Sequence, residues 1–234
     1  MGYLYRPEGD GPFPTVIYNH GSRIGRDREP RPWVSFGGLF VAAGYAVLVP
    51  ERRGYGKSDG PVWIDAVGRD STSRFIDRCE AETDDVLAAV DFLGTVPFVD
   101  RSRLGIVGWS IGGIVTLFAL ARSKAFRAAV DQASGVLTWR RSPALQAALT
   151  EAVRRATCPV FLMDAENDAA PEAIPTLARA MEAAALPHKA TIYPAYMPTH
   201  PTPDSAPGHA LFEPAGIPIW GNDAVSFLDS YLKP

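Results

Sequence analysis

The sequence around Ser110 has the residue types and spacing of an activated nucleophile. Gly108-Trp109-Ser110-Ile111-Gly112 follows the apolar run Leu104 to Val107 and precedes a second one, Ile114 to Ala121. A strand that turns sharply into a helix presents the serine hydroxyl above the sheet, and small neighbours let the helix pack closely. We therefore expect Ser110 to attack a carbonyl carbon.

The pentapeptide G-x-S-x-G is by itself a weak signal, because glycine and serine occur together in many turns. The alternative is a serine in a strand-to-helix loop that carries no chemistry. The apolar, strand-like run before the motif and the buried helix expected after it favour a nucleophile elbow.

A serine nucleophile needs a base, and the base needs an acid that fixes its tautomer. The loop Asp164 to Pro171 follows the apolar run Pro159 to Met163 and supplies acids at a strand end. We expect Asp168 to be the acid of the triad. Asp164 is the main alternative, and it could equally be a buried helper that hydrogen-bonds the loop, whereas Glu166 is expected to face solvent.

The base should follow the last strand if the chain order is serine, acid, histidine. Four histidines are present; His20 ends an early strand, and His188 precedes the last strand as an expected surface residue. His209 is preferred because Pro207 to Phe212 gives it an apolar anchor. His200, within a proline-rich run, remains the alternative, and either histidine could be an ordinary loop residue.

Two backbone amides are expected to bind the developing oxyanion, which is usually the largest electrostatic contribution to acyl transfer. The first is the N–H of Ile111, directly after the nucleophile. The second is expected in the loop Tyr18 to Ser22, where Gly21 permits the backbone to turn toward the site. We assign Ser22 N–H, with Gly21 N–H as the alternative.

Arginine and tryptophan side chains are the remaining candidates for substrate contacts. Arginine forks could bind a substrate carboxylate, although structural ion pairs are the more common role; the residues are Arg23, Arg26, Arg52 and Arg53. Tryptophans could wall a pocket or pack in the core; these are Trp33, Trp63, Trp109 and Trp139. Trp109, beside the nucleophile, is the expected substrate-binding residue.

Alternating strand-like and helix-like segments predict the elements that position these residues. The expected strands are Thr15 to Asn19, Tyr45 to Pro50, Leu104 to Trp109, Arg127 to Gln132, Pro159 to Asp164 and Lys189 to Tyr193. The expected helices are Pro32 to Ala43, Cys79 to Leu93, Ile111 to Arg122, Ala144 to Arg155 and Pro171 to Ala185. Asp59 to Arg78 is expected to be irregular, and Met197 to Gly208 a structured loop. This order is typical of a doubly wound, mostly parallel α/β sheet with helices on both faces.

The composition fits one α/β domain, residues 1–234, and argues against several partners. The hydrophobic share is 47% and the formal net charge −3, so neither nucleic acid nor an anionic membrane surface is an expected partner. Cys79 and Cys158 are expected to be free thiols, and with no signal sequence or long apolar stretch the expected location is cytoplasmic. No cofactor or metal is expected, since Gly56-Lys57-Ser58 lacks the P-loop glycine at Glu51 and no two histidines have the i, i+4 spacing of a helical zinc site.

Five motifs together resemble the α/β-hydrolase superfamily, in its dienelactone hydrolase-like and prolyl-peptidase-like branch. They are His20-Gly21-Ser22, Arg52 to Ser58, Gly108 to Gly113, the D-x-x-P at Asp168, and Gly208-His209. The resemblance implies an α/β-hydrolase fold without a large cap domain and hydrolysis through an acyl-enzyme. With fourteen residues before Thr15, the sheet is expected to be trimmed at its N-terminal edge.

The expected function is that of a carboxylesterase acting on small acyl esters. Dienelactone-type enzymes often use cysteine where this chain has Ser110, which favours ester chemistry in general over that lactone reaction. A small-peptide hydrolase and a lactone hydrolase are the alternatives among enzymes. A non-catalytic binding module on the same fold is the alternative from another class.

Overall fold

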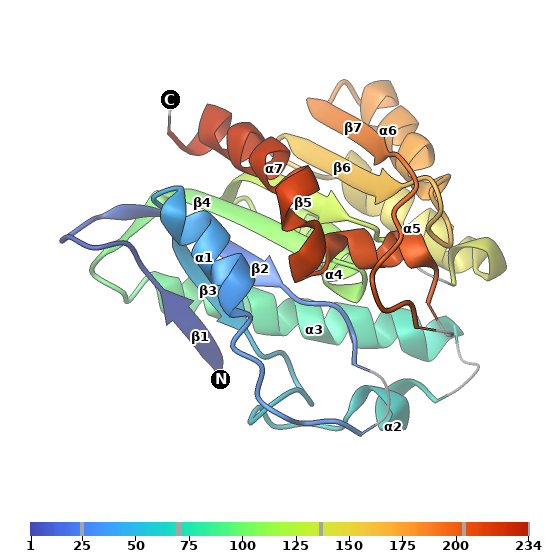
Figure 1. The fold of residues 1–234 in the computed structure, drawn as a ribbon, viewed down its shortest axis with the longest axis horizontal. Helices are drawn as coiled ribbons and strands as arrows, with labels where there is room; N and C mark the ends of the chain where they lie inside the picture. The colour runs from blue at the N-terminus through green and yellow to red at the C-terminus, as the bar shows by residue number, and fades with distance from the viewer. Residues whose placement is uncertain (24–25, 69–71, 136–137, 203–204, 234) are drawn as a thin grey trace.

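The computed structural model describes residues 1–23, 26–68, 72–135, 138–202 and 205–233 (Figure 1). Within these residues, seven strands form one sheet in the order β1-β3-β2-β4-β5-β6-β7. Their bounds are β1 Gly2–Tyr5, β2 Phe13–Asn19, β3 Ala46–Pro50, β4 Val99–Trp109, β5 Phe126–Gln132, β6 Val160–Ala165 and β7 His188–Tyr193. Strand β1 is antiparallel to β3, and every other neighbouring pair is parallel.

Helices cover both faces of the sheet. Their bounds are α1 Val34–Ala42, α2 Trp63–Val67, α3 Thr72–Leu93, α4 Ile111–Arg122, α5 Pro143–Arg154, α6 Ala173–Ala183 and α7 Ile217–Leu232. Three short 3-10 helices lie at η1 Trp139–Arg141, η2 Pro207–Phe212 and η3 Pro214–Gly216. Helices α1 and α7 lie on one face, and α3 to α6 on the other (Figure 1).

Alternation along the strands divides the core between these two faces. Val16 and Tyr18 of β2 pack on the side of α1 and α7, together with Phe36 and Trp220. Ile17 points to the other side and joins the larger cluster under α3 to α6. Strands buried on both faces are expected to be apolar throughout, which explains the uninterrupted apolar runs in the sequence.

The α/β-hydrolase fold class and all six predicted strands are confirmed, with end positions shifted by a few residues. The sheet holds one antiparallel strand, β1, at the edge where trimming was expected. The prediction that Asp59 to Arg78 is irregular was wrong, since α2 and the first turns of α3 lie there. Helix α7 was not predicted, because its sequence begins with Ile217-Pro218 and follows a proline-rich loop.

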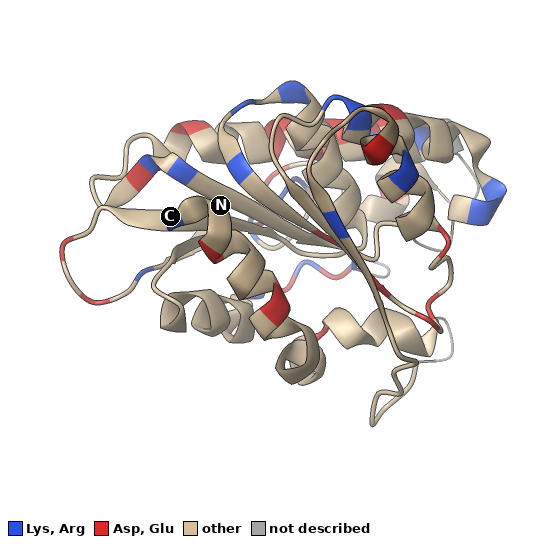
Figure 2. Cartoon of the chain, turned by 90° about the horizontal axis from the view of Figure 1, so that it is seen from above, with Lys and Arg blue, Asp and Glu red and all other residues tan. Residues whose placement is uncertain are grey.

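Charged residues lie on the surrounding helices and loops, and the central strands carry few (Figure 2). Both acidic and basic positions occur on these helices and loops, and the formal net charge is −3. In the described ranges, no helix has the length and apolar character needed to cross a membrane.

Candidate active site

Ser110 sits in a strained backbone conformation between β4 and α4. Its φ of 59° and ψ of −124° are unusual for a residue with a side chain, and its amide donates to the Gln132 carbonyl at 2.8 Å. A Cβ atom at Gly108 would lie 2.1 Å from the Gly112 carbonyl oxygen. Only glycine fits this position, so the sharp turn that presents Ser110 depends on it.

The start of α4 leaves free amides beside Ser110. In the described part of the chain, no carbonyl accepts a hydrogen bond from the Ile111 amide, as is usual for the first turn of a helix. The helix start also packs tightly on the end of β2, since a Cβ atom at Gly112 would lie 2.0 Å from the Asn19 carbonyl oxygen. The Ile111 amide, the predicted oxyanion donor, thus has no carbonyl partner in the described chain.

Asp168 and His209 meet from two separate loops. His209 Nδ1 lies 2.8 Å from Asp168 Oδ2, and the Asp168 side chain is almost fully buried. Asp168 follows β6, whereas His209 lies in η2, whose Leu211 carbonyl accepts a hydrogen bond from the Trp220 indole at 3.0 Å. A Cβ atom at Gly208 would come within 2.5 Å of the Asp168 amide nitrogen. The two predicted residues, Asp168 and His209, are thus hydrogen-bonded, and the packing of η2 holds them together.

Trp109 joins this pair to the nucleophile. Its ring lies 5.3 Å from the His209 ring, centroid to centroid. A Cβ atom at Gly21 would lie 3.1 Å from Trp109 Cε3 and 3.3 Å from Ser110 Cβ. His209 and Ser110 share no hydrogen bond among the described residues, which is common before substrate is bound.

A second buried carboxyl group, that of Asp164, lies beside Asp168. Burial favours the neutral form of Asp168, but the hydrogen bond and charge of His209, with a hydrogen bond to Asp164, lower its pKa. Burial and the nearby Asp168 charge hold the pKa of Asp164 far above its ordinary range. These directions favour a neutral Asp164 beside an ionised Asp168. Asp164 is buried and accepts a hydrogen bond from the Ala165 amide at 2.8 Å, as in the alternative in which it is a buried residue that hydrogen-bonds the loop.

Asp131 is a further buried acid that was not singled out in the sequence. It is the next-to-last residue of β5, it accepts a hydrogen bond from Ser134 Oγ at 2.7 Å, and its pKa is raised by burial to about 7. It also raises the pKa of Asp164 through its charge. Its place at the carboxyl end of a parallel strand was the signal that could have identified it.

The predicted oxyanion loop lies against the nucleophile. In the described residues, neither the Gly21 amide nor the Ser22 amide donates to a protein carbonyl. Gly21 is buried and Ser22 is exposed. His20, just before them, is fully buried, stacks on Trp33 at 5.5 Å, and its pKa is held well below the usual value by burial and by Arg52.

The remaining candidate residues from the sequence have other surroundings. His200 is exposed and forms no hydrogen bond with Asp168 in the described chain. Each of the four arginines considered for substrate binding forms an ion pair instead: Arg23 with Glu51, Arg26 with Asp65, Arg52 with Glu82, and Arg53 with Asp85. Both cysteines are buried and free. The described residues hold no group of three or more His, Cys, Asp and Glu side chains placed to bind a metal.

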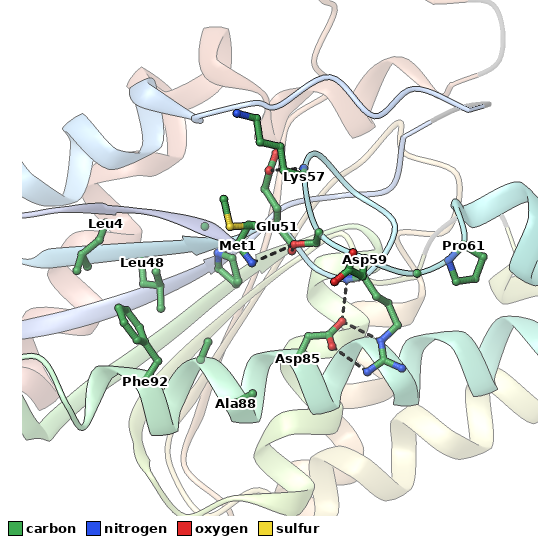
Figure 3. A pocket seen from close by; sticks show the side chains of 16 residues that line it. Met1, Leu4, Leu48, Glu51, Lys57, Asp59, Pro61, Asp85, Ala88 and Phe92 are labelled. Atoms are coloured by element: carbon green, nitrogen blue, oxygen red, sulfur yellow. Dashed lines mark hydrogen bonds and ion pairs between the residues drawn. The ribbon is translucent and has the colours of Figure 1, made fainter.

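A cavity of about 850 Å³ lies between β1, β3 and α3 (Figure 3). Its apolar floor includes Leu4, Leu48 and Phe92, and its rim carries Lys57 and Asp59. Neither Ser110 nor the Asp168–His209 pair lines it. The predicted triad residues therefore take no part in forming this cavity.

Comparison with known proteins decides the family. The model of the prolyl oligopeptidase family matches residues 38–205, which is most of the chain. The chain belongs to the prolyl oligopeptidase family. This confirms the resemblance drawn from the motifs and supports a serine hydrolase, without deciding between ester and peptide bonds.

Individual relatives are similar over part or all of the chain. An uncharacterized peptidase, YuxL of Bacillus subtilis, is 31% identical over 144 residues, covering 57% of this chain and 19% of its own length. Est1E from Butyrivibrio proteoclasticus, solved with ferulic acid bound, has a TM-score of 0.71 at 18% identity and covers 100% of this chain and 96% of its own. The acylaminoacyl peptidase of Pyrococcus horikoshii has a TM-score of 0.71 at 17% identity, covering 99% of this chain and 39% of its own.

The structural likenesses, at these identities, establish the fold alone. The chain spans 19% to 39% of the length of the curated relatives it matches. The activity and substrate of the whole protein are therefore matters for proposal.

Proposed function

We propose that this protein is a serine hydrolase that cleaves small carboxylic esters through an acyl-enzyme. The observation that carries the proposal is the contact of His209 Nδ1 with Asp168 Oδ2 at 2.8 Å, beside a serine with a φ of 59° at a strand-to-helix turn. An acid, a base and a serine nucleophile from three separate segments of the chain are the parts that acyl transfer requires.

The proposed reaction begins when Ser110 Oγ attacks the ester carbonyl carbon while His209 Nε2 accepts the hydroxyl proton. Asp168 accepts the Nδ1–H, which fixes the histidine tautomer and stabilises its positive charge. The oxyanion is bound by Ile111 N–H together with Ser22 N–H or Gly21 N–H. His209 then protonates the departing alcohol, which leaves an ester of Ser110.

Water completes the cycle. His209 removes a proton from a water molecule, the hydroxide attacks the acyl carbon, and the same imidazole returns the proton to Ser110 as the carboxylic acid leaves. Trp109 is proposed to contact the substrate, because its ring lies against His209. A cytoplasmic location is part of the same proposal.

A small-peptide hydrolase is the second candidate, favoured by the family to which the chain belongs. The same serine, histidine and aspartate could cleave either an ester or an amide bond. An amide needs more help from the histidine, because its leaving group is poorer than that of an activated ester. A lactone substrate would follow the same steps. A binding module without activity is the remaining hypothesis.

The test is hydrolysis of p-nitrophenyl esters from short to long acyl chains, beside matched aminoacyl p-nitroanilides. We expect ester turnover that peaks at short chains and is lost in Ser110→Ala and His209→Ala, whereas the control His200→Ala keeps it. Turnover of anilides in preference to esters would favour the peptidase. A folded wild type that neither turns over a substrate nor reacts with a fluorophosphonate would favour the binding module.

A further inference from the structure

A buried ion cluster lies directly behind the proposed oxyanion loop. The Arg52 side chain is fully buried, and its Nε donates to Glu82 Oε2 at 2.6 Å. The other oxygen of Glu82 accepts from Arg78 Nε at 2.6 Å. Two guanidinium groups thus share one carboxylate, which leaves one net positive charge inside the protein.

Such a cluster is an expensive way to stabilise a fold. Removing charges from water costs several kcal/mol per ion, and an apolar replacement is often as stable or more stable. The presence of the cluster therefore calls for a role beyond packing. The position of the cluster suggests such a role, because Arg52 is also hydrogen-bonded to the segment His20 to Ser22, which approaches Ser110.

The second contact of Arg52 is with the backbone. Its Nη2 donates to the His20 carbonyl at 2.7 Å, and its guanidinium lies 5.5 Å from the centre of the Tyr55 ring. Tyr55 in turn packs edge-on against the His20 ring at 4.7 Å. The His20 residue is thus held through its carbonyl and through its ring.

The direction of the His20 carbonyl determines the direction of the next amide. The peptide between His20 and Gly21 is trans, so its C=O and N–H groups point in opposite directions. Because the carbonyl is turned toward buried Arg52, the Gly21 N–H is turned away from it. The Ser22 amide follows one residue later on the same segment.

The segment also contacts the nucleophile and the start of α4. A Cβ atom at Gly21 would lie 3.3 Å from Ser110 Cβ, and one at Gly112 would lie 2.6 Å from the His20 carbonyl oxygen. Small rotations of this peptide would therefore change the distance between the free amides and the place where an oxyanion forms.

We propose that Arg52 is a positioning residue of the oxyanion hole, which pins the His20 carbonyl so that the Gly21 and Ser22 amides are held facing Ser110. The inference rests on the proposed serine hydrolase function. The buried positive charge of the cluster also favours an anion at that place, which adds to the effect of the two amides. Arg52 itself touches neither substrate nor the reacting atoms.

The test compares Arg52→Gln with wild type on an ester and on the matching thionoester, in which sulfur replaces the carbonyl oxygen. Sulfur is larger and a weaker acceptor, so an ordered oxyanion hole prefers the oxygen substrate. Glu82 keeps Arg78 as its partner in this variant, which supports folding. We expect kcat for the ester to fall about 10- to 100-fold with little change in KM, and the ester-to-thionoester ratio to fall with it.

Two more variants separate positioning from charge and from general damage. Arg52→Lys keeps the charge beside Glu82 but lacks the fork that reaches two partners, so it should show the same lowered ratio. Arg53→Gln removes a neighbouring arginine that pairs with half-exposed Asp85, and it should leave the ratio unchanged. Circular dichroism and the melting temperature establish that each variant is folded.

The outcomes are distinct. A folded Arg52→Gln or Arg52→Lys with the wild-type ratio would overturn the role of Arg52, while loss of turnover in Ser110→Ala would still support the proposed hydrolase. Failure of the wild type to turn over any ester, thionoester or anilide would overturn the proposed function itself. If Arg52→Gln does not fold, the ratio for Arg52→Lys decides the question alone.

Discussion

Two aspartates, Asp164 in β6 and Asp168 just after it, have pKa values that their surroundings shift in opposite directions. Asp168 is bonded to His209 and its pKa is lowered, whereas burial and the Asp168 charge raise the pKa of Asp164. Asp164 Oδ1 also accepts the Ala165 amide at 2.8 Å, which fixes the carboxyl group in place. The opposite pKa shifts favour the proton on Asp164 and the negative charge on Asp168, which faces the histidine.

Replacing each aspartate by asparagine should separate these roles. Asp168→Asn removes the anion that holds the His209 tautomer, and we expect kcat to fall about 10³- to 10⁴-fold. Asp164→Asn should stay within about tenfold of wild type, because the amide can donate the hydrogen bond that the protonated carboxyl donates. Steady-state ester kinetics check both. Equal losses in the two variants would contradict the assignment of Asp168 as the acid.

The stability of the protein should depend on pH through Asp164. Above the ordinary carboxyl pKa, the unfolded chain has released this proton while the folded chain still binds it, so stability falls as pH rises. Asp164→Asn lacks the group and should lose less stability between pH 5 and pH 9. Melting temperatures across this range provide the measurement. Parallel curves for the two proteins would show that Asp164 is not held protonated by the fold.

At the scale of elements, the active site is assembled by close approach between α4 and the ends of β2 and β4. Gly108 and Gly112 make this approach possible, because a side chain at either position would meet backbone atoms at 2.1 Å and 2.0 Å. The strained turn at Ser110 is thus maintained by the packing of a buried helix rather than by the turn residues alone.

Adding one methyl group at Gly112 should disturb this packing. We expect Gly112→Ala to destabilise the protein by about 1–3 kcal/mol through overpacking against the Asn19 carbonyl. Gly38→Ala is the matched control, since Gly38 lies exposed in α1 with nothing within 4 Å of an added Cβ, and should stabilise by about 0.5–1 kcal/mol. Urea denaturation measures both, and equal shifts would contradict the packing argument.

Sequence patterns predicted the elements whose identity is decided by local residues. Strands β2 to β7 and the turn at Ser110 could be predicted, because buried parallel strands have continuous apolar runs and the turn has the G-x-S-x-G pattern. Helix α7 and strand β1 were not, because their places depend on packing against distant parts of the sheet. The Arg52 contact with His20 joins residues 32 positions apart and had no local signal.

At the scale of the whole molecule, one sheet separates two apolar clusters. Leu117 of α4 lies in the cluster on one face, and Leu228 of α7 in the cluster on the other. Both side chains are fully buried. Because the same strands contribute to both clusters, loss of packing on one face should weaken the other.

Truncation in either cluster should therefore lower one common transition. We expect Leu117→Ala and Leu228→Ala each to cost about 2–5 kcal/mol and to leave a single cooperative unfolding step. Far-UV circular dichroism and tryptophan fluorescence should report the same midpoint for each variant. Two separate transitions would contradict the prediction that residues 1–234 form one domain.

The two edge strands of the sheet, β1 and β7, have features that hinder pairing with strands of other molecules at high protein concentration. Strand β1 has only four residues, and β7 carries Lys189, whose ammonium lies 4.2 Å from the centre of the Phe161 ring. Short edges and edge lysines hinder strand pairing between molecules. The sheet thus ends on both sides in segments that resist growth into fibrils, and a valine in place of Lys189 would remove that protection during refolding at high concentration.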